Sequence, residues 1–334
     1  MKRRRKRRSP AGIFGLIALS VVGAGLVAAS VATQLRAAEP VTIVAVGDIA
    51  CSPTHVFFNG GAGTDTWCRM KATSDLALSL EPDAALVLGD LQYEDGTLAA
   101  FQRSYDTNWG RLKEITRPAV GNHEYQTKGA KGYFDYFGAV AGIRGLGFYS
   151  YDLGDWHVVA LNSQCSEVGC GVGSVQEQWL RADLAANPKL CTLAYWHHPR
   201  FSSGGHGNDD DLQPLWQALQ DHEADVVLAG HDHNYERFAP QRADGVFDRN
   251  GIRSFVVGSG GKNLDPFRKI KANSVVRNNT DFGVLKMTLD RRSYSWQFIN
   301  VDGEVKDKGE ADCVTEPAGR SAATTPEPTP RPTP

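Results

Sequence analysis

The body of this sequence lacks an excess of positive charge. The chain has 36 lysine and arginine residues against 38 acidic ones, but eight of the basic residues and none of the acids fall within residues 1–38. From Glu39 onward, 28 basic and 38 acidic residues give a formal charge of −10. Binding to the phosphate backbone of nucleic acids requires a basic surface. The composition therefore excludes a general nucleic-acid-binding protein.

The N-terminal segment carries the positive charge that the body lacks. Seven consecutive basic residues, 2–8, precede an apolar run over residues 11–32 whose only polar members are Ser20 and Ser30. This order is typical of a secretory signal peptide or an uncleaved membrane anchor. The run is long enough to span a bilayer, and residues 30–32 fit the small-x-small cleavage rule, so both alternatives stay open. We expect an exported body that is secreted or anchored on the outer face of the cytoplasmic membrane.

Cysteine is scarce, and none of the six cysteines lies in a nucleophile motif, which argues against thiol catalysis. An even number in an exported chain predicts three disulfide bonds. Six cysteines allow 15 pairings. We predict two bonds that each close a Gly-rich loop and one that ties down the C-terminus: Cys51–Cys68, Cys165–Cys170 and Cys191–Cys313.

Short apolar runs alternate with helical stretches along the body. The pattern predicts strands that include 41–46, 84–88, 117–120, 192–196, 224–229, 254–257, 283–290 and 294–300, a hairpin over 147–162, and helices over 69–80, 97–109, 174–185 and 212–222. The aromatic-rich segment 132–138 reads as an ordered loop. This alternation favours a layered α/β domain with a mixed sheet or two packed sheets. We therefore divide the chain into an N-terminal signal or anchor (1–38), a catalytic domain (39–313) and a Pro/Thr-rich disordered tail (314–334).

Five predicted strands end in side chains that can bind a metal ion. Because strand ends in such a fold share one rim of the sheet, these side chains are expected to converge. Oxygen and imidazole ligands without cysteine favour iron, zinc or manganese. The set is too large for one ion, so we infer two ions about 3.5–4 Å apart, bridged by one carboxylate. The side chains are Asp48, Asp90, Asn122, His197 and the pair His231 and His233.

The sequence resembles the calcineurin-like metallophosphoesterase superfamily and, within it, the purple acid phosphatase-like branch. The matching motifs are Gly47-Asp48, Gly89-Asp90-Leu91-Gln92-Tyr93, Gly121-Asn122-His123-Glu124, Trp196-His197-His198-Pro199 and Gly230-His231-Asp232-His233. The resemblance spans roughly residues 41–300. It implies a four-layer α/β/β/α sandwich of two mixed β-sheets flanked by helices, with the metal pair at the C-terminal ends of strands.

The resemblance also implies how the ligands divide between the two ions. The first ion would take Asp48, Asp90, Tyr93 and His233, and the second would take Asp90, Asn122, His197 and His231, with Asp90 as the bridge. In the purple branch the tyrosine is a phenolate that binds Fe(III), next to a divalent Fe, Zn or Mn ion. Tyr93 therefore decides the branch, and the alternative that it is an aromatic residue packed under the site stays open.

The same resemblance implies hydrolysis of a phosphate ester by in-line attack of a metal-bound hydroxide. Fe(III) and a divalent ion, offset by two aspartates and a phenolate, leave a charge of +2, which matches a phosphate dianion. His123 would contact the phosphate and help the leaving group. His206, in a Gly-rich loop, is a candidate general acid, although a solvated loop histidine is an equal alternative. Glu124 and Asp232 are expected to orient their neighbours.

These observations favour an exported, acid phosphatase-like phosphomonoesterase whose partner is its phosphate-ester substrate. A phosphodiesterase or nucleotidase of the same superfamily is one alternative. A non-catalytic metal-binding surface protein is another, from a different class. The sequence leaves the substrate, the metal identities and the oligomeric state open.

Overall fold

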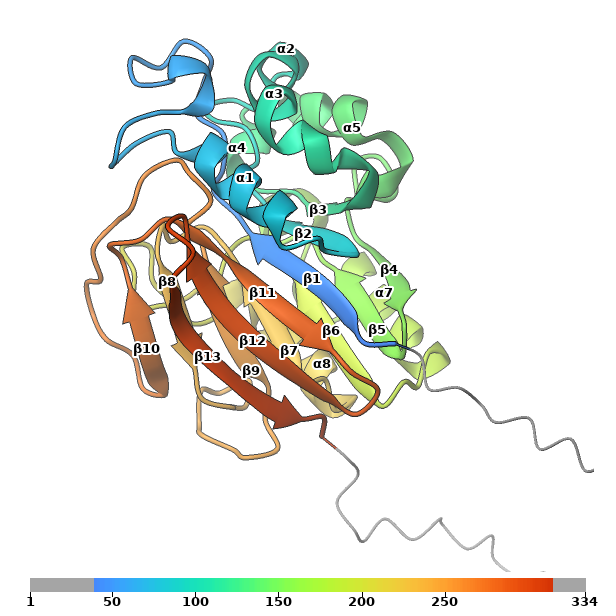
Figure 1. Ribbon diagram of the computed structural model, residues 1–334. Coiled ribbons are helices and arrows are strands. Elements are labelled where there is room, and N and C mark those ends of the chain that lie inside the picture. The colour runs from blue at the N-terminus through green and yellow to red at the C-terminus, as the bar shows by residue number, and fades with distance from the viewer. Residues whose placement is uncertain (1–38, 315–334) are drawn as a thin grey trace, which may run out of the picture. The chain divides into compact units, whose positions relative to one another are not determined.

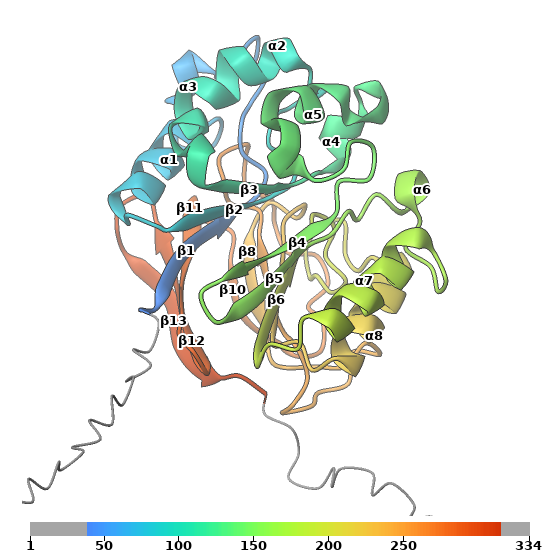
Figure 2. The ribbon, with the colours of Figure 1, turned by 90° about the vertical axis from the view of Figure 1, so that its right-hand side faces the viewer.

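Two β-sheets packed face to face form the centre of the protein, and helices cover both outer faces (Figures 1 and 2). The structure is a computed structural model that describes residues 39–314. The predicted four-layer α/β/β/α sandwich is confirmed. The predicted signal or anchor and nearly all of the predicted disordered tail lie outside the described residues. Within residues 39–314, no helix is both long enough and apolar enough to cross a membrane.

The first sheet has six strands in the order β13-β12-β11-β1-β2-β3. β1, β2 and β3 run parallel, so their C-terminal ends meet at one edge. β2 is buried along its whole length because both faces are covered. The strands are β1 (Val41–Val46), β2 (Ala84–Leu88), β3 (Thr116–Ala119), β11 (Gly283–Leu289), β12 (Ser293–Asn300) and β13 (Val305–Asp312).

The second sheet has seven strands in the order β10-β8-β9-β7-β6-β5-β4. β5, β6, β7 and β9 are parallel, whereas β4 pairs with β5 as the predicted antiparallel hairpin. The strands are β4 (Tyr149–Leu153), β5 (Trp156–Ala160), β6 (Cys191–Tyr195), β7 (Val226–Ala229), β8 (Tyr235–Phe238), β9 (Arg253–Val257) and β10 (Ser274–Asn278). Both sheets therefore present C-terminal ends of parallel strands.

Helices form the two outer layers. Figure 2 shows α1, α2, α3 and α5 over the first sheet, with α7 and α8 against the second. Ser174 caps α7 by accepting a hydrogen bond from the Glu177 backbone N–H at 3.2 Å. The helices are α1 (Met70–Ser79), α2 (Leu98–Ala100), α3 (Asp106–Asn108), α4 (Asn122–Tyr125), α5 (Lys131–Phe137), α6 (Cys165–Val168), α7 (Val175–Ala186) and α8 (Gln213–Asp221), with a π-helical turn at Phe101–Tyr105 and short 3₁₀ turns at Asn59–Gly61, Trp109–Ile115, Lys128–Ala130, Gly138–Ala141 and Asp210–Leu212.

The prediction of a loop over 132–138 was wrong, because this segment forms helix α5. Its aromatic residues pack against the neighbouring helical segment, where the ring of Tyr136 stacks on that of Phe101 with centroids 5.0 Å apart. Tyr133 is fully buried. Tertiary packing thus outweighs the weak helix propensity of a short segment rich in aromatic residues and glycine.

The three predicted disulfide bonds are confirmed. Cys51 pairs with Cys68, Cys165 with Cys170, and Cys191 with Cys313. No cysteine among the described residues is free. The last bond joins the start of β6 to the residue after β13 and so links the two sheets covalently.

Candidate metal centre

The predicted metal ligands lie at the edge where the parallel strands of both sheets end. Asp48, Asp90 and Asn122 follow β1, β2 and β3 in the first sheet. His197 follows β6, and His231 and His233 follow β7, in the second sheet. This is the edge at which α/β sheets bind ligands. The face-to-face packing of the sheets brings the side chains of the first sheet close to those of the second.

One group gathers around the carboxylate of Asp48, which is fully buried. The Tyr93 hydroxyl donates to Asp48 Oδ1 at 2.8 Å and lies 2.9 Å from His233 Nε2. His233 Nε2 is 3.3 Å from Asp48 Oδ1. Three of the four side chains predicted for the first ion are therefore in mutual contact.

A second group gathers around His197. Its Nε2 atom lies 3.3 Å from Asp90 Oδ2, 3.1 Å from Asn122 Oδ1 and 3.2 Å from His231 Nδ1. All four side chains predicted for the second ion thus meet at one point. Asp48, Asp90 and His197 each offer a ligand atom within 4.8 Å of the others, which joins the two groups.

Hydrogen bonds orient two of the histidine rings toward the centre. His197 Nδ1 lies 2.8 Å from the carbonyl oxygen of Leu88, which can only accept, so Nδ1 carries the proton. His233 Nδ1 lies 3.0 Å from Asn263 Oδ1. In each ring Nε2, the nitrogen left to bind a metal ion, then faces a carboxylate. Metal-binding histidines are commonly fixed in this way.

The electrostatics of the site favour added positive charge. Burial alone would raise the pKa of Asp90, but His197 and His123 lower that pKa well below its usual value. Burial lowers the pKa of His197, and Asp90 more than reverses this and raises it to about 9. Burial, with the carboxylates of Asp48 and Asp90, raises the pKa of the Tyr93 phenol well above its usual value. A phenolate on Tyr93 therefore requires a cation to offset the carboxylates.

The donor set fits a pair of metal ions. Among the described residues, the ion-pair partners of Asp48 and Asp90 are histidines, with no lysine or arginine. Two buried carboxylates without a permanent cation are costly unless a metal ion binds them. Carboxylate, imidazole, amide and phenol donors suit iron, zinc or manganese. Two other clusters that contain cysteine, Cys51–His55–Cys68 and Cys191–Asp225–Cys313, have no thiols to offer because their cysteines form disulfide bonds.

Glycines allow the ligands to approach one another's backbones. Gly89 has a φ of +81°, and a Cβ atom there would lie 2.6 Å from the ring of His197. A Cβ atom on Gly121 would lie 2.2 Å from Asp90 Oδ1. Each of these glycines precedes one predicted ligand and makes room for another from a different strand. The glycines of the motifs thus have a steric role in assembling the site.

The two predicted catalytic histidines lie on the rim of the centre. His123 Nδ1 is 2.6 Å from the carbonyl oxygen of Glu94, so its Nε2 atom faces the site, 3.9 Å from Asp90 Oδ2. The exposed ring of His206 lies 4.1 Å from that of His231, between centroids. Both rings are therefore within reach of a molecule bound at the centre.

Glu124 and Asp232 orient the residues around them, as expected. The buried Glu124 carboxylate accepts hydrogen bonds from the backbone N–H groups of Asp90, Gln92 and Gly121 at 2.8–3.1 Å. It therefore holds the loops after β2 and β3 together. The Asp232 carboxylate accepts from the His206 backbone N–H at 2.9 Å and from a serine hydroxyl of the same loop, which fixes the loop beside His231.

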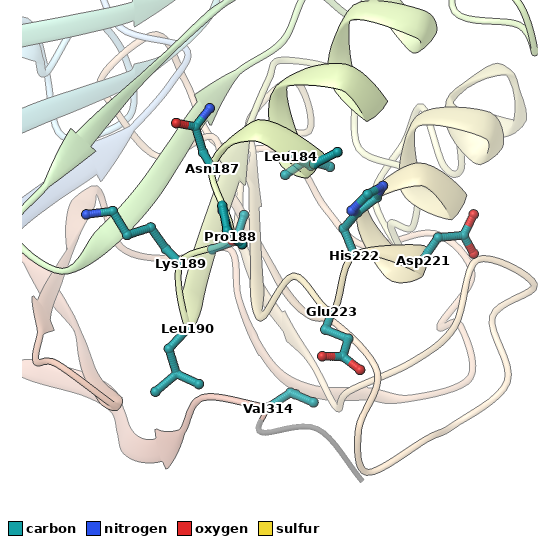
Figure 3. A pocket seen from close by; sticks show the side chains of 11 residues that line it. Leu184, Asn187, Pro188, Lys189, Leu190, Asp221, His222, Glu223 and Val314 are labelled. Carbon is teal, nitrogen blue, oxygen red and sulfur yellow. The ribbon is translucent and has the colours of Figure 1, made fainter. Parts of the chain in front are cut away.

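A cavity of about 390 Å³ opens beside the second group. It is lined by His198, His206 and His231 and by the acidic residues Asp209–Asp211. Another cavity, of about 480 Å³, lies near the C-terminal ends of α7 and α8, and Figure 3 shows Leu190, Glu223 and Val314 among the side chains that line it. None of the predicted metal ligands lines this second cavity, whereas His231 lines the first, so the first cavity is the one that adjoins the candidate metal centre.

Two residues that contact the predicted ligands stand in none of the sequence motifs. Asn263 orients His233, and Lys262 places its ammonium group 4.5 Å from the centroid of the Tyr93 ring. Both follow β9, whose sequence resembled no metal-binding motif. Their partners come from other strand ends, so no local sequence pattern could have identified them.

Comparisons with known proteins agree with this geometry. A family model described as calcineurin-like phosphoesterase matches residues 39–235. Purple acid phosphatase 23 of Arabidopsis thaliana is 26% identical over 223 residues, which cover 55% of this chain and 48% of the relative. Probable inactive purple acid phosphatase 1 of the same plant is 30% identical over 283 residues, covering 71% and 44%. The chain thus spans about half the length of these relatives.

A solved structure shares the fold. The purple acid phosphatase PPD1 from seeds of yellow lupin, Lupinus luteus, aligns with a TM-score of 0.64 over 82% of this chain and 54% of the lupin chain, at 22% identity. The family model covers more than half of this chain. The chain therefore belongs to the calcineurin-like phosphoesterase family and resembles its purple acid phosphatase members.

Proposed function

We propose that this protein is an exported phosphomonoesterase that uses two metal ions, one of them Fe(III) bound by Tyr93. The observation that carries the proposal is the meeting of seven donor side chains from both sheets around Asp48 and Asp90. Two ions bound there would supply positive charge against the phosphate and activate a water molecule.

The protein's own residues hold this site in a fixed geometry. We assign Asp90 as the ligand that bridges the ions; its Oδ2 lies 3.3 Å from His197 Nε2, and its Oδ1 accepts a hydrogen bond from the His123 backbone N–H at 2.8 Å. Asp48 Oδ2 accepts from the His231 backbone N–H at 2.8 Å. Such preorganised donors do not need to rearrange during the reaction, which is the main protein contribution to phosphoryl transfer.

The rim histidines supply hydrogen-bond donors to the substrate. His123 presents Nε2 toward the centre and, with both ring nitrogens protonated, can donate from Nε2 to a phosphate oxygen. His206 lies on the cavity side, next to His231, where the oxygen of the leaving group would emerge. We assign His123 to phosphate binding and His206 to protonation of the leaving group.

Export is part of the same proposal. Three disulfide bonds suit an oxidising compartment rather than the cytosol. The basic and apolar N-terminal sequence supports transport across the membrane. Fractionating the producing cells tests this directly, and recovery of the disulfide-bonded protein in the cytosol would contradict it.

Activity of Asp90→Asn tests the catalytic proposal. This variant, loaded with metal, should hydrolyse an aryl phosphate more than about 100-fold more slowly than wild type. Losing a residue that only supports a metal ligand typically costs about 10–100-fold in activity, and the loss of the proposed bridging ligand itself should cost more. The matched control is Asp302→Asn, which alters an exposed carboxylate far along the chain. Equal activity in Asp90→Asn and wild type would refute the proposal.

The same assay separates the alternatives. Faster turnover of a diester than of the matching monoester would favour a phosphodiesterase. One relative is named a probable inactive phosphatase, and a protein that binds two metal ions but hydrolyses neither ester would favour a non-catalytic role. The intact donor set favours the enzyme.

A further inference from the structure

Lys262 is a buried cation beside a predicted metal ligand. Its residue is 6% exposed, and its Nζ lies 4.5 Å from the centroid of the Tyr93 ring and 6.0 Å from that of Trp67. The ammonium group forms an ion pair with the carboxylate of Glu94, the residue that follows Tyr93. A buried lysine is costly without such partners. The contacts therefore fix the ammonium group against the Tyr93 ring.

The backbone around Lys262 leaves it little freedom to move. Its N–H donates to the carbonyl oxygen of Asp48 at 3.0 Å, and its carbonyl accepts from the Cys68 N–H at 3.0 Å. The preceding Gly261 packs so closely on helix α1 that a Cβ atom there would lie 2.6 Å from the Met70 nitrogen. Lys262 is thus tied to a metal-ligand loop and to a disulfide-bonded loop. Its backbone is therefore fixed relative to Asp48, a predicted metal ligand.

The charge of Lys262 acts on Tyr93 more than that of its partner does. The Lys262 side chain is 8% exposed, whereas the Glu94 side chain is 55% exposed, so water screens the carboxylate and not the ammonium. A cation on the face of an aromatic ring interacts with its π electrons. On the hydroxyl side, Tyr93 meets the carboxylate of Asp48. Lys262 therefore opposes the electron-donating effect of the carboxylates on this ring.

We propose that Lys262 is a positioning residue that sets the electron-donor strength of Tyr93 toward iron. This inference rests on the proposed binding of Fe(III) by Tyr93. A positive charge on the ring lowers the energy of the phenolate electrons, so transferring an electron from the ring to iron takes more energy. The same charge favours Fe(II) over Fe(III). Lys262 thus moves the charge-transfer band to shorter wavelength and raises the reduction potential of the iron.

The test compares iron-loaded wild type with Lys262→Met and Lys262→Arg, using the visible spectrum and the reduction potential. Lys262→Met removes the charge and keeps an unbranched side chain, so its band should move to longer wavelength and its potential should fall. Lys262→Arg keeps the charge and should retain the wild-type values. A purely structural role would not separate the two variants in this way.

Glu94→Gln provides a second variant at an exposed position, for the case in which Lys262→Met does not fold. It leaves the ammonium without its counter-charge, so the band should move to shorter wavelength. An unmoved band in Lys262→Met, or in Glu94→Gln when Lys262→Met does not fold, overturns the Lys262 inference alone. A wild-type protein that binds iron without a charge-transfer band overturns binding by Tyr93, and this inference falls with it.

Discussion

Gly89→Ala tests whether the two sheets assemble the site by close contact. The left-handed backbone at Gly89, with a φ of +81°, costs alanine roughly 1–2 kcal/mol. In addition, the new methyl group would meet the His197 ring at 2.6 Å. His197 is fully buried and its Nδ1 is held by Leu88, so the ring cannot retreat easily. Overpacking of this kind costs about 1–3 kcal/mol more.

Gly60→Ala is the matched control for this prediction. Gly60 has a φ of +63°, but a Cβ atom there would meet nothing within 4 Å. Urea unfolding of the metal-free proteins should therefore show a loss of about 2–5 kcal/mol for Gly89→Ala and about 1–2 kcal/mol for Gly60→Ala. Metal analysis should show that Gly89→Ala also loses the ion that we propose His197 binds. Equal stability losses and an unchanged metal content in the two variants would refute the reasoning.

Three further predictions concern stability and metal binding. Burial raises the pKa of Asp225 from 3.8 to about 7, so the folded state retains a proton that the unfolded state releases, and the free energy of unfolding should fall as the pH rises from about 4 to about 7. Urea unfolding across this pH window should show a weaker dependence of that free energy on pH for Asp225→Asn than for wild type, and an equally steep dependence would count against this. Replacing both Cys191 and Cys313 by serine should lower the free energy of unfolding by about 5 kcal/mol, because this disulfide closes a loop of 122 residues; replacing Cys165 and Cys170, which are five residues apart, should lower it by about 2 kcal/mol. The reverse order in thermal or urea unfolding would contradict this. Glu124→Gln removes an acceptor for the N–H groups of Asp90 and Gly121, so metal titration should show about 10–100-fold weaker binding than in wild type or in the exposed control Glu167→Gln; unchanged affinity would show that Glu124 does not support the ligands.

The strand ends could be predicted because each is a local pattern. A buried apolar run followed by Gly-Asp or Gly-His is visible in the sequence, as at Gly89-Asp90 after β2. Strand β13 could not be predicted in this way, because as an edge strand it is largely exposed and rich in charged residues. β8 and β10 were also missed. These strands are defined by pairing with neighbours rather than by their own composition.

The residues of the candidate site also differ in how far they could be predicted from the sequence. The donor residues stand in short motifs, whereas their supports depend on contacts between distant loops. Lys262 reaches Tyr93 only because the loops after β9 and β2 meet. The chain of α5 forms a helix only because its aromatic rings pack against the segment around Phe101. A single sequence does not encode such contacts as a readable pattern.

The metal stoichiometry of the purified protein tests the proposed two-metal centre. We expect two ions per chain in wild type, one of them iron, and fewer in Asp90→Asn, because Asp90 is the proposed bridging ligand. Tyr93→Phe should keep bound metal but lose the tyrosinate-to-iron absorption band. Fewer than one ion per wild-type chain, or two ions retained in Asp90→Asn, would contradict the two-metal centre.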